Sequence, residues 1–216
     1  MTLSRPDIRR DDPFPPSHTA LLLVDMQRIW LEPGRNPGHP DWDADHPFHR
    51  DVAARAIPNQ ARLLAAARAG GVEVIHTIIR SLTRDGRDRS LDHKMTPLHV
   101  GPDDPLALPV PALAVGADEI LLPKTSSGVF NSTNIDYVLR NLGVTHLVVV
   151  GIMTDQCVDM AVRDAADRGF IVTCVGDACA AATPERHANA LGAFGGYCWV
   201  ADTDTVEARF RAMRGA

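Results

Sequence analysis

The chain has 216 residues, of which 45% are hydrophobic, and its 22 basic and 27 acidic residues leave a formal net charge of −5. Without a basic excess or a polybasic segment, this composition argues against nucleic-acid and membrane partners and favours a small-molecule partner. No apolar stretch approaches the roughly 20 residues that cross a bilayer, and the length fits one domain with a sizeable core.

The N-terminal segment is polar and rich in proline, so we expect an arm over 1–18 followed by one domain over 19–216. The arm lacks the apolar centre of a signal peptide, which indicates a cytoplasmic protein. The four cysteines, Cys157, Cys174, Cys179 and Cys198, show no CxxC pairing. We therefore expect reduced thiols, and neither a disulfide scaffold nor zinc held by cysteines.

Short apolar runs alternate with helical stretches along the chain. They cover 19–26, 72–79, 118–123, 144–151, 170–177 and 197–202. Near-continuous valine, isoleucine and leucine are typical of parallel strands buried on both faces. The pattern predicts the α/β class, with a single doubly wound, Rossmann-like sheet of six parallel strands and helices on both faces.

Two long polar segments follow the first two strands directly. Residues 28–51 and 80–105 are rich in glycine, proline and charge. Ligands of α/β sheets bind beyond the carboxyl ends of strands, and loops of this length usually serve binding or assembly. We expect these segments to form either a lid over a ligand or a subunit interface, and the sequence leaves both open.

The helices between the later strands have recognisable boundaries. Apolar residues from 158 to 165 recur at helical spacing, and Gly169 ends that helix. An earlier helix is expected over about 134–142. Thr183 followed by Pro184 predicts a further helix start, with a side-chain cap and proline in the first turn.

Three reactive side chains stand where different strands end. Asp25 closes "LLLVDMQ", Lys124 closes "ILLPK", and Cys157 begins the helix after "VVVGIMTDQ". A right-handed parallel sheet brings these strand ends to one edge. There the helix start and the lysine are expected to lower the pKa of the thiol, and the aspartate to accept its proton. The sequence thus predicts a nucleophile with its base.

Three blocks in this order resemble the isochorismatase-like cysteine hydrolases: "LLLVDMQ" (21–27), "LPKTSSGVFNSTNID" (122–136) and "VVVGIMTDQCVDMAVRDAADRGF" (148–170). The resemblance covers about 19–202. This family includes nicotinamidases, N-carbamoylsarcosine amidohydrolases and the ureidoacrylate, biuret and triuret hydrolases. The resemblance implies Cys157 as the nucleophile, Asp25 as the general base and later acid, and Lys124 as the cation that orients Asp25 and favours the thiolate.

The same resemblance implies a cis peptide bond at Ile152–Met153. The backbone N–H groups of Met153 and Cys157 would then form an oxyanion hole, which stabilises a carbonyl oxygen as it becomes negative. No cofactor is implied. A homo-oligomer, either a dimer or a tetramer, is implied by the resemblance alone.

The expected reaction is cleavage of a C–N bond in a small amide, with release of ammonia through a thioester. Aromatic residues make up 5% of the chain, which leaves few rings to stack on a pyridine. We therefore expect a ureido or carbamoyl substrate, of the ureidoacrylate, biuret, triuret or N-carbamoyl type, rather than nicotinamide. The residues next to the triad in sequence are expected to form the pocket wall: Gln27, Trp30, Arg80, Phe130, Asn131, Thr154 and Gln156.

Three alternatives stay open. A nicotinamidase would bind a metal, and "HPDWDADHPFH" (39–49) contains the residue types of such a block. It follows the first strand and not the second, however, so we expect no metal and interpret His39, His46 and His49 as solvated loop residues. A vinyl-ether hydrolase of the isochorismatase type would not need Cys157, and a binding module on the same fold would keep the pocket without turnover.

Overall fold

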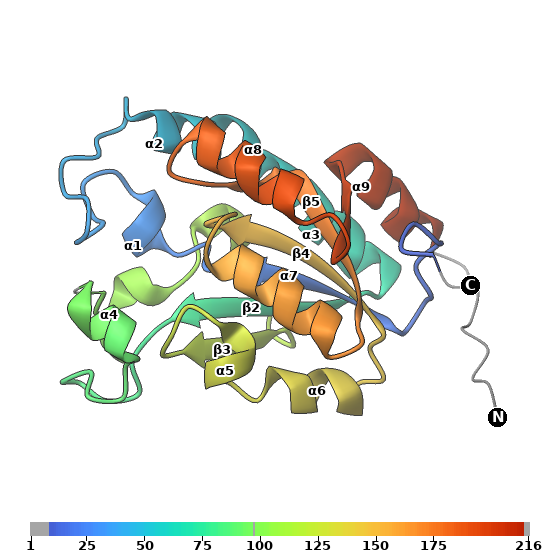
Figure 1. The fold of residues 1–216 in the computed structure, drawn as a ribbon, viewed down its shortest axis with the longest axis horizontal. Helices are drawn as coiled ribbons and strands as arrows, with labels where there is room; N and C mark the ends of the chain where they lie inside the picture. The colour runs from blue at the N-terminus through green and yellow to red at the C-terminus, as the bar shows by residue number, and fades with distance from the viewer. Residues whose placement is uncertain (1–8, 97, 214–216) are drawn as a thin grey trace.

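The computed structural model describes residues 9–96 and 98–213. Its centre is a six-stranded parallel sheet in the order β3-β2-β1-β4-β5-β6 (Figure 1). The strands are β1 (Thr19–Val24), β2 (Glu73–Ile79), β3 (Ile120–Lys124), β4 (His146–Ile152), β5 (Ile171–Ala180) and β6 (Cys198–Ala201). The predicted α/β class is confirmed, and each expected strand is present with ends shifted by a few residues. This strand order is doubly wound, with its switch point between β1 and β4.

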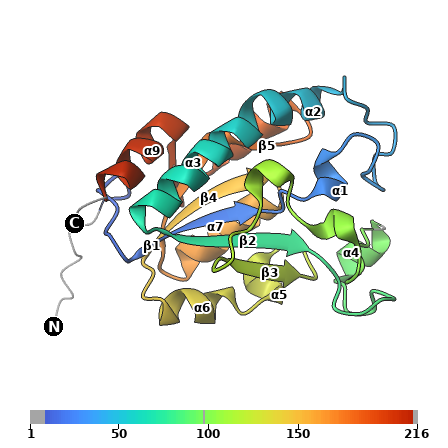
Figure 2. The same cartoon turned by 180° about the vertical axis from the view of Figure 1, so that it is seen from behind.

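Helices cover both faces of the sheet (Figures 1 and 2). One face carries α3 (Ile57–Gly70) and α9 (Thr203–Ala212), and the other carries α5 (Val129–Ser132), α6 (Ile135–Asn141), α7 (Cys157–Asp167) and α8 (Pro184–Ala193). The long segments after β1 and β2 contain short helices, α1 (Arg28–Leu31), α2 (Pro47–Asp51) and α4 (Leu91–Met95). A π-helical turn at Val52–Ala56 joins α2 to α3, and 3-10 turns lie at Pro105–Ala107 and Pro111–Leu113.

The core lies on both sides of the central strands. Every residue of β1 is buried, which explains its unbroken apolar sequence. On α7 the expected apolar stripe is confirmed, because Val158, Ala161, Val162 and Ala165 have no exposed surface. Thr183 caps α8 as predicted, since its Oγ1 accepts a hydrogen bond from the Arg186 N–H at 3.2 Å. The packing of α7 fixes the position of its first residue at the carboxyl edge of the sheet.

The N-terminal arm is only partly within the described residues, because 1–8 lie outside them. The described part packs on α9: the Phe14 ring is 5% exposed and its centroid lies 5.8 Å from that of Phe210. Arg209 holds the adjacent backbone by donating to the Asp12 carbonyl at 2.7 Å. All four cysteines are free. Within the described ranges, no helix has the length and apolar character needed to cross a membrane.

Candidate active site

Asp25 lies immediately after β1 in an unusual backbone conformation, with a φ of 55°. Non-glycine residues seldom occupy this region unless surrounding contacts hold them there. Two such contacts come from β2 and the following turn: the Asp25 N–H donates to the Thr77 carbonyl at 3.1 Å, and its carbonyl accepts from the Gln27 N–H at 2.7 Å. The carboxylate is 2% exposed, and its Oδ1 accepts a hydrogen bond from Thr77 Oγ1 at 3.0 Å.

Lys124 is the last residue of β3 and has no exposed surface. A buried ammonium group is stable only where it is paired and hydrogen-bonded. Its Nζ lies 2.8 Å from Asp25 Oδ2 and donates to the carbonyls of Ser126 and Ser127, each at 3.0 Å. The two carbonyls and Cys157 Sγ, 3.4 Å away, are the hydrogen-bond acceptors of this group, and the Asp25 carboxylate compensates its charge.

Cys157 is the first residue of α7, and the turn before it depends on Gly151. Gly151 has a φ of 132°, and a Cβ there would lie 2.2 Å from the Val24 carbonyl oxygen of β1. Only glycine lets the end of β4 approach β1 so closely. The following peptide bond, Ile152–Met153, is cis, as expected. The chain then enters α7, which presents the thiol at the edge of the sheet.

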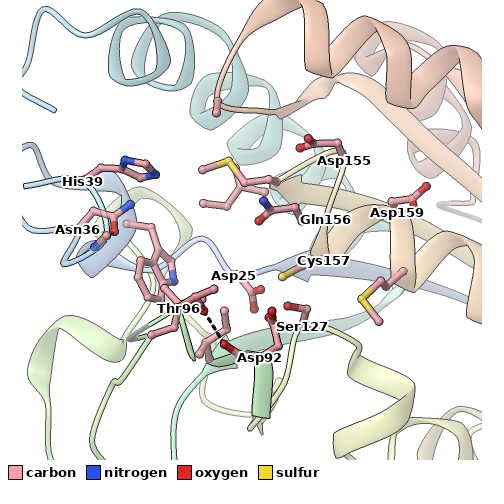
Figure 3. Close-up of a pocket in the computed structure, with 18 of the residues that line it drawn as sticks. Asp25, Asn36, His39, Asp92, Thr96, Ser127, Asp155, Gln156, Cys157 and Asp159 are labelled. Atoms are coloured by element: carbon pink, nitrogen blue, oxygen red, sulfur yellow. Dashed lines mark hydrogen bonds between the residues drawn. The ribbon is translucent and has the colours of Figure 1, made fainter. Parts of the chain in front are cut away.

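The structure brings the three predicted side chains together. Lys124 Nζ lies 3.4 Å from Cys157 Sγ and 2.8 Å from Asp25 Oδ2, so the ammonium group contacts both. Figure 3 shows the Asp25 carboxylate and the Cys157 sulfur facing each other at the centre of a pocket. A carboxylate, an ammonium and a thiol thus meet where β1, β3 and α7 converge.

The expectation that the thiol has a lowered pKa is wrong. Burial raises the pKa of Cys157 to about 12, which outweighs the opposing effect of the Lys124 charge, and the charge of Asp25 raises it further. The sequence places the lysine beside the thiol but does not show how completely both are removed from water. Burial also opposes the charged form of Lys124, but the charge of Asp25, together with the contact with Cys157, prevails and raises the pKa of Lys124. The resting site therefore holds a protonated thiol beside a permanently charged ammonium group.

Two backbone donors at the site are unengaged. Within the described part of the chain, neither the Met153 N–H nor the Cys157 N–H donates a hydrogen bond. The Cys157 N–H belongs to the first turn of α7, where N–H groups have no partner inside the helix. Both residues line the pocket. Their N–H groups can donate hydrogen bonds to a negatively charged oxygen there.

Asp25 and Cys157 form the floor of a pocket of about 600 Å³, and Lys124 is buried beneath them, outside the lining. One wall comes from the segment after β1, with Trp30, Asn36, Gly38 and His39, and another from the segment after β2, with Asp92, Thr96 and Leu98. Asp155, Gln156, Asp159, Met160, Ala182 and Arg186 complete it on the side of α7 and α8. Both long polar segments therefore contribute to the wall of this pocket.

Two of the seven expected wall residues, Trp30 and Gln156, line the pocket. Gln27 is fully buried and instead links strands, because its side chain accepts from the Ile79 N–H at 2.7 Å and donates to the Ile79 carbonyl at 2.9 Å. Thr154 is also fully buried, with its hydroxyl 2.8 Å from His187 Nδ1. Neither side chain is among those lining the pocket.

The other three expected wall residues also lie outside the lining. Phe130 packs into the core beneath α7, with its ring centroid 6.2 Å from that of Phe170. Arg80 is half-buried and Asn131 is exposed, and neither lines the pocket. Closeness in sequence to the triad is therefore a poor guide to the wall, because strand and helix geometry turns alternate side chains away from the ligand.

His93 lies next to the site and was not identified from the sequence. It is fully buried in α4, and its Nε2 lies 3.2 Å from Ser127 Oγ. Ser127 in turn lines the pocket, and its carbonyl accepts from Lys124. Burial lowers the pKa of His93, as does the nearby charge of Lys124. The polar character of 80–105 signalled a ligand role for this segment, but not which of its residues reach the site.

The histidine-rich segment is solvated only in part, because His39 is exposed as expected and His46 is half-buried. His49 is 4% exposed, and burial lowers its pKa. His39 and His46 both stack on Trp42, with centroid separations of 4.0 and 4.1 Å. The indole therefore engages both rings and keeps them from converging on one ion. Among the described residues, no group of three or more His, Cys, Asp or Glu side chains is placed to hold a metal ion.

Comparison with known proteins agrees with this architecture. The model of the isochorismatase domain family matches residues 19–205. A relative from Arabidopsis thaliana, named "Probable inactive nicotinamidase", is 35% identical over 177 residues, which cover 79% of this chain and 84% of the relative. A ureidoacrylate amidohydrolase from Serratia proteamaculans is 29% identical, over 95% of this chain and 88% of its own. The crystal structure of a cysteine hydrolase from Pseudomonas syringae pv. phaseolicola superposes with a TM-score of 0.81 at 26% identity, covering 98% of this chain and 100% of that one.

Proposed function

The chain belongs to the isochorismatase family and is a hydrolase of carbon–nitrogen bonds other than peptide bonds. From this premise we propose that its reaction depends on Cys157 as a nucleophile. The observation that carries the proposal is the contact of one buried ammonium group, Lys124 Nζ, with both Asp25 and Cys157 on the floor of the pocket. A nucleophile beside a base that a third group orients is the arrangement that covalent catalysis requires.

The first step is attack on the amide. Sγ of Cys157 bonds to the carbonyl carbon while Asp25 takes the thiol proton. Because the pKa of the thiol is about 12, proton transfer accompanies the attack and does not precede it. The carbonyl oxygen becomes an oxyanion, which accepts hydrogen bonds from the N–H groups of Met153 and Cys157. Lys124 keeps its charge throughout and holds the carboxylate in place.

The second half of the reaction releases the products. Asp25 returns its proton to the leaving nitrogen as the C–N bond breaks, so ammonia departs and a thioester stays on Cys157. Water then attacks the thioester carbon while Asp25 accepts a proton from it. The C–S bond breaks, the sulfur recovers a proton, and the acid product leaves. These steps use only residues of this chain and water.

The proposed substrate is a ureido or carbamoyl compound rather than nicotinamide. Trp30 and the imidazole of His39 are the rings that line the pocket within the described residues, and His39 is already stacked on Trp42. Side chains that can hydrogen-bond to a ureido group surround the floor instead, among them Ser127 and Gln156. The homo-oligomeric state, as a dimer or tetramer, is part of the same proposal and rests on the family resemblance.

The test is ammonia release from nicotinamide, ureidoacrylate, N-carbamoyl amino acids, biuret and triuret, after exhaustive chelation of metals. We expect at least one ureido compound to be cleaved by the wild type and not by Cys157→Ala. Turnover that survives the substitution would favour a vinyl-ether hydrolase. Release that chelation abolishes would favour a metal-dependent nicotinamidase, and tight ligand binding without turnover by the wild type would favour a binding module.

A further inference from the structure

The ionisable side chains that line the pocket are mostly acidic. Apart from the imidazole of His39 and the thiol of Cys157, they are Asp25, Asp92, Asp155, Asp159 and Arg186. Arg186 is thus the single guanidinium or ammonium group in the lining, as far as the described residues extend. A carboxylate on a ligand would need a cation or several N–H donors in such a site. Whether the pocket can bind an anionic ligand therefore depends on whether its cations are already paired with carboxylates of the protein.

Arg186 is already matched by a carboxylate. Its Nε donates to Asp155 Oδ2 in a short ion pair, and both residues line the pocket. Asp159 is likewise matched, because Arg163 Nε lies 2.8 Å from its Oδ1 along α7. Neither ion pair leaves an uncompensated positive charge for a ligand.

Asp92 is the unmatched member of the lining. Its carboxylate makes no hydrogen bond or ion pair with the described residues, and only its backbone carbonyl is engaged, by Thr96. Asp25 is paired with Lys124, so each lining carboxylate except Asp92 has its own cation. The lining side chains and their paired cations therefore carry one excess negative charge, on the exposed side chain of Asp92.

The side chains around the reactive centre are also rich in hydrogen-bond acceptors. The carboxylates accept only, and the amide oxygen of Gln156 is a further acceptor in the lining, whereas that of Asn36 already accepts from the Gly38 N–H at 2.9 Å. Figure 3 shows Asp92, Asp155 and Asp159 distributed around Asp25 and Cys157 on different sides of the pocket. A ligand that offers N–H groups would meet acceptors in several directions, whereas a carboxylate would meet like charge.

We propose that the substrate is an amide whose portion beyond the scissile bond bears no carboxylate and presents N–H donors or a positive charge towards Asp92. This inference rests on the proposed amidohydrolase function and narrows it. It selects uncharged polyamides and amino-substituted ureas, and it rejects N-carbamoyl amino acids. Arg186 does not bind an anionic substrate, because its positive charge is already compensated by the carboxylate of Asp155.

Three ureas that differ only in the charge of a short tail test the proposal: N-carbamoylglycine (anionic), N-carbamoylglycinamide (uncharged) and N-(2-aminoethyl)urea (cationic). Their dissociation constants for the Cys157→Ala protein, measured by calorimetry at low ionic strength, report charge preference independently of turnover. We expect the uncharged and cationic ureas to bind about 10-fold or more tightly than the anion, with a gap that narrows as salt is added. Preferred binding of the anion, or no binding of the other two, would overturn the inference.

Turnover separates this inference from the function on which it rests. If the binding order is as expected but the wild type releases no ammonia from any of the three ureas, the amidohydrolase proposal fails while the charge preference stands. If the anion is the best substrate, cleavage through Cys157 stands and the charge preference fails. The two failures are therefore distinguishable in one set of assays.

Matched aspartate substitutions locate the effect. Asp92→Asn should lower the affinity for the cationic urea, relative to the affinity for the uncharged urea, by about 5-fold or more. Asp155→Asn should leave Arg186 without its carboxylate partner. The affinity for the anionic urea, relative to that for the uncharged urea, should then rise by a similar factor. Asp118→Asn removes an exposed carboxylate just before β3, at the opposite edge of the sheet, and should change neither ratio. Equal shifts in all three variants would show that net charge, and not the pocket, sets the preference.

Discussion

An ionic cluster stands at each end of β3, and the two clusters are built differently. At the carboxyl end, Lys124 contacts Asp25 and the sulfur of Cys157. Just before the amino end, Glu119 accepts from Arg68 Nε at 2.7 Å, from the Gly116 N–H at 2.6 Å and lies 3.2 Å from His76 Nε2. Adjacent residues of β2 serve the two clusters, since His76 contacts Glu119 and Thr77 donates to Asp25.

The difference shows what separates a reactive cluster from a structural one. Both oxygens of Glu119 have donors, and the hydrogen bonds from Arg68 in particular lower the pKa of Glu119 to about 2. Neither Glu119 nor its partners Arg68 and His76 line the pocket described above. At the carboxyl end, by contrast, a thiol with a raised pKa faces a pocket in which two N–H groups are unengaged. Satisfied groups stabilise the fold, and groups left unsatisfied at the pocket are available to a substrate.

Removal of the nucleophile should have the largest effect. We expect Cys157→Ala to lower kcat by at least about 10⁴-fold, because the proposed thioester cannot form. Cys198→Ala removes another buried thiol, on β6, and should leave kcat within about 2-fold of the wild type. Ammonia release by both variants, with circular dichroism to verify folding, checks the prediction. Comparable losses in both variants would mean that the thiol is needed only for packing.

Removal of the buried cation should affect both activity and stability. Lys124→Met leaves the Asp25 carboxylate buried without its partner, so we expect turnover to be lost and the free energy of unfolding to fall by about 3–5 kcal/mol. Urea unfolding at neutral pH measures the second effect. The double variant Asp25→Asn/Lys124→Met removes both charges and should recover part of that stability without recovering activity. If the double variant is less stable than Lys124→Met, the loss of stability comes from lost hydrogen bonds to Asp25 and not from its uncompensated charge.

The acidity of the thiol should distinguish assisted attack from a preformed thiolate. With a pKa of about 12, Cys157 should react slowly with iodoacetamide at neutral pH and faster as the pH rises. In Asp25→Asn the pKa should fall, because the carboxylate no longer raises it while Lys124 still lowers it. The pH dependence of alkylation, with the rate for Cys157→Ala subtracted, measures both. Fast alkylation of the wild type at pH near 6, well below that pKa, would contradict the assisted mechanism.

The sequence predicted the parts of the molecule that depend on regular structure. The six strands follow from buried apolar runs, and Asp25, Lys124 and Cys157 meet because parallel strands end at one edge. The pocket wall could not be predicted in the same way. Contributions such as His39 and Asp92 depend on how long loops pack, and this is not periodic in sequence. The thiol pKa had the wrong expected sign because depth of burial is a property of the whole fold.

The cluster at the amino end of β3 escaped sequence analysis for a related reason. Arg68 and Glu119 are 51 positions apart, and each has the local sequence of an ordinary surface charge. Only the packing of α3 against the sheet brings them together with His76, which is 1% exposed. Long-range ion pairs of this kind have no local signature, whereas a thiol at a strand-to-helix turn does.

The smallest expected effect concerns this structural cluster. The pKa of Glu119 is lowered to about 2 in the folded protein against 4.5 for the free group, so its contribution to stability is present above about pH 4.5 and is lost as the pH falls towards 2. Glu119→Gln should therefore cost about 1–2 kcal/mol at neutral pH and progressively less in acid, while turnover is retained. Urea unfolding of wild type and variant across this pH range measures the difference.

A carboxyl group on the same edge supplies a control of opposite sign. Burial raises the pKa of Glu73, and the charge of Asp118 raises it further, so its ionised form is disfavoured in the folded protein. At pH values above the pKa of Glu73, Glu73→Gln should therefore stabilise the fold by a small amount, and in acid it should have no such effect. Glu119→Gln, by contrast, should destabilise the fold at neutral pH. If the two variants shift the urea midpoint in the same direction at neutral pH, loss of side-chain packing would account for both. Opposite shifts would show that hydrogen bonds from Arg68 and its neighbours, and not position at this edge, make Glu119 stabilising.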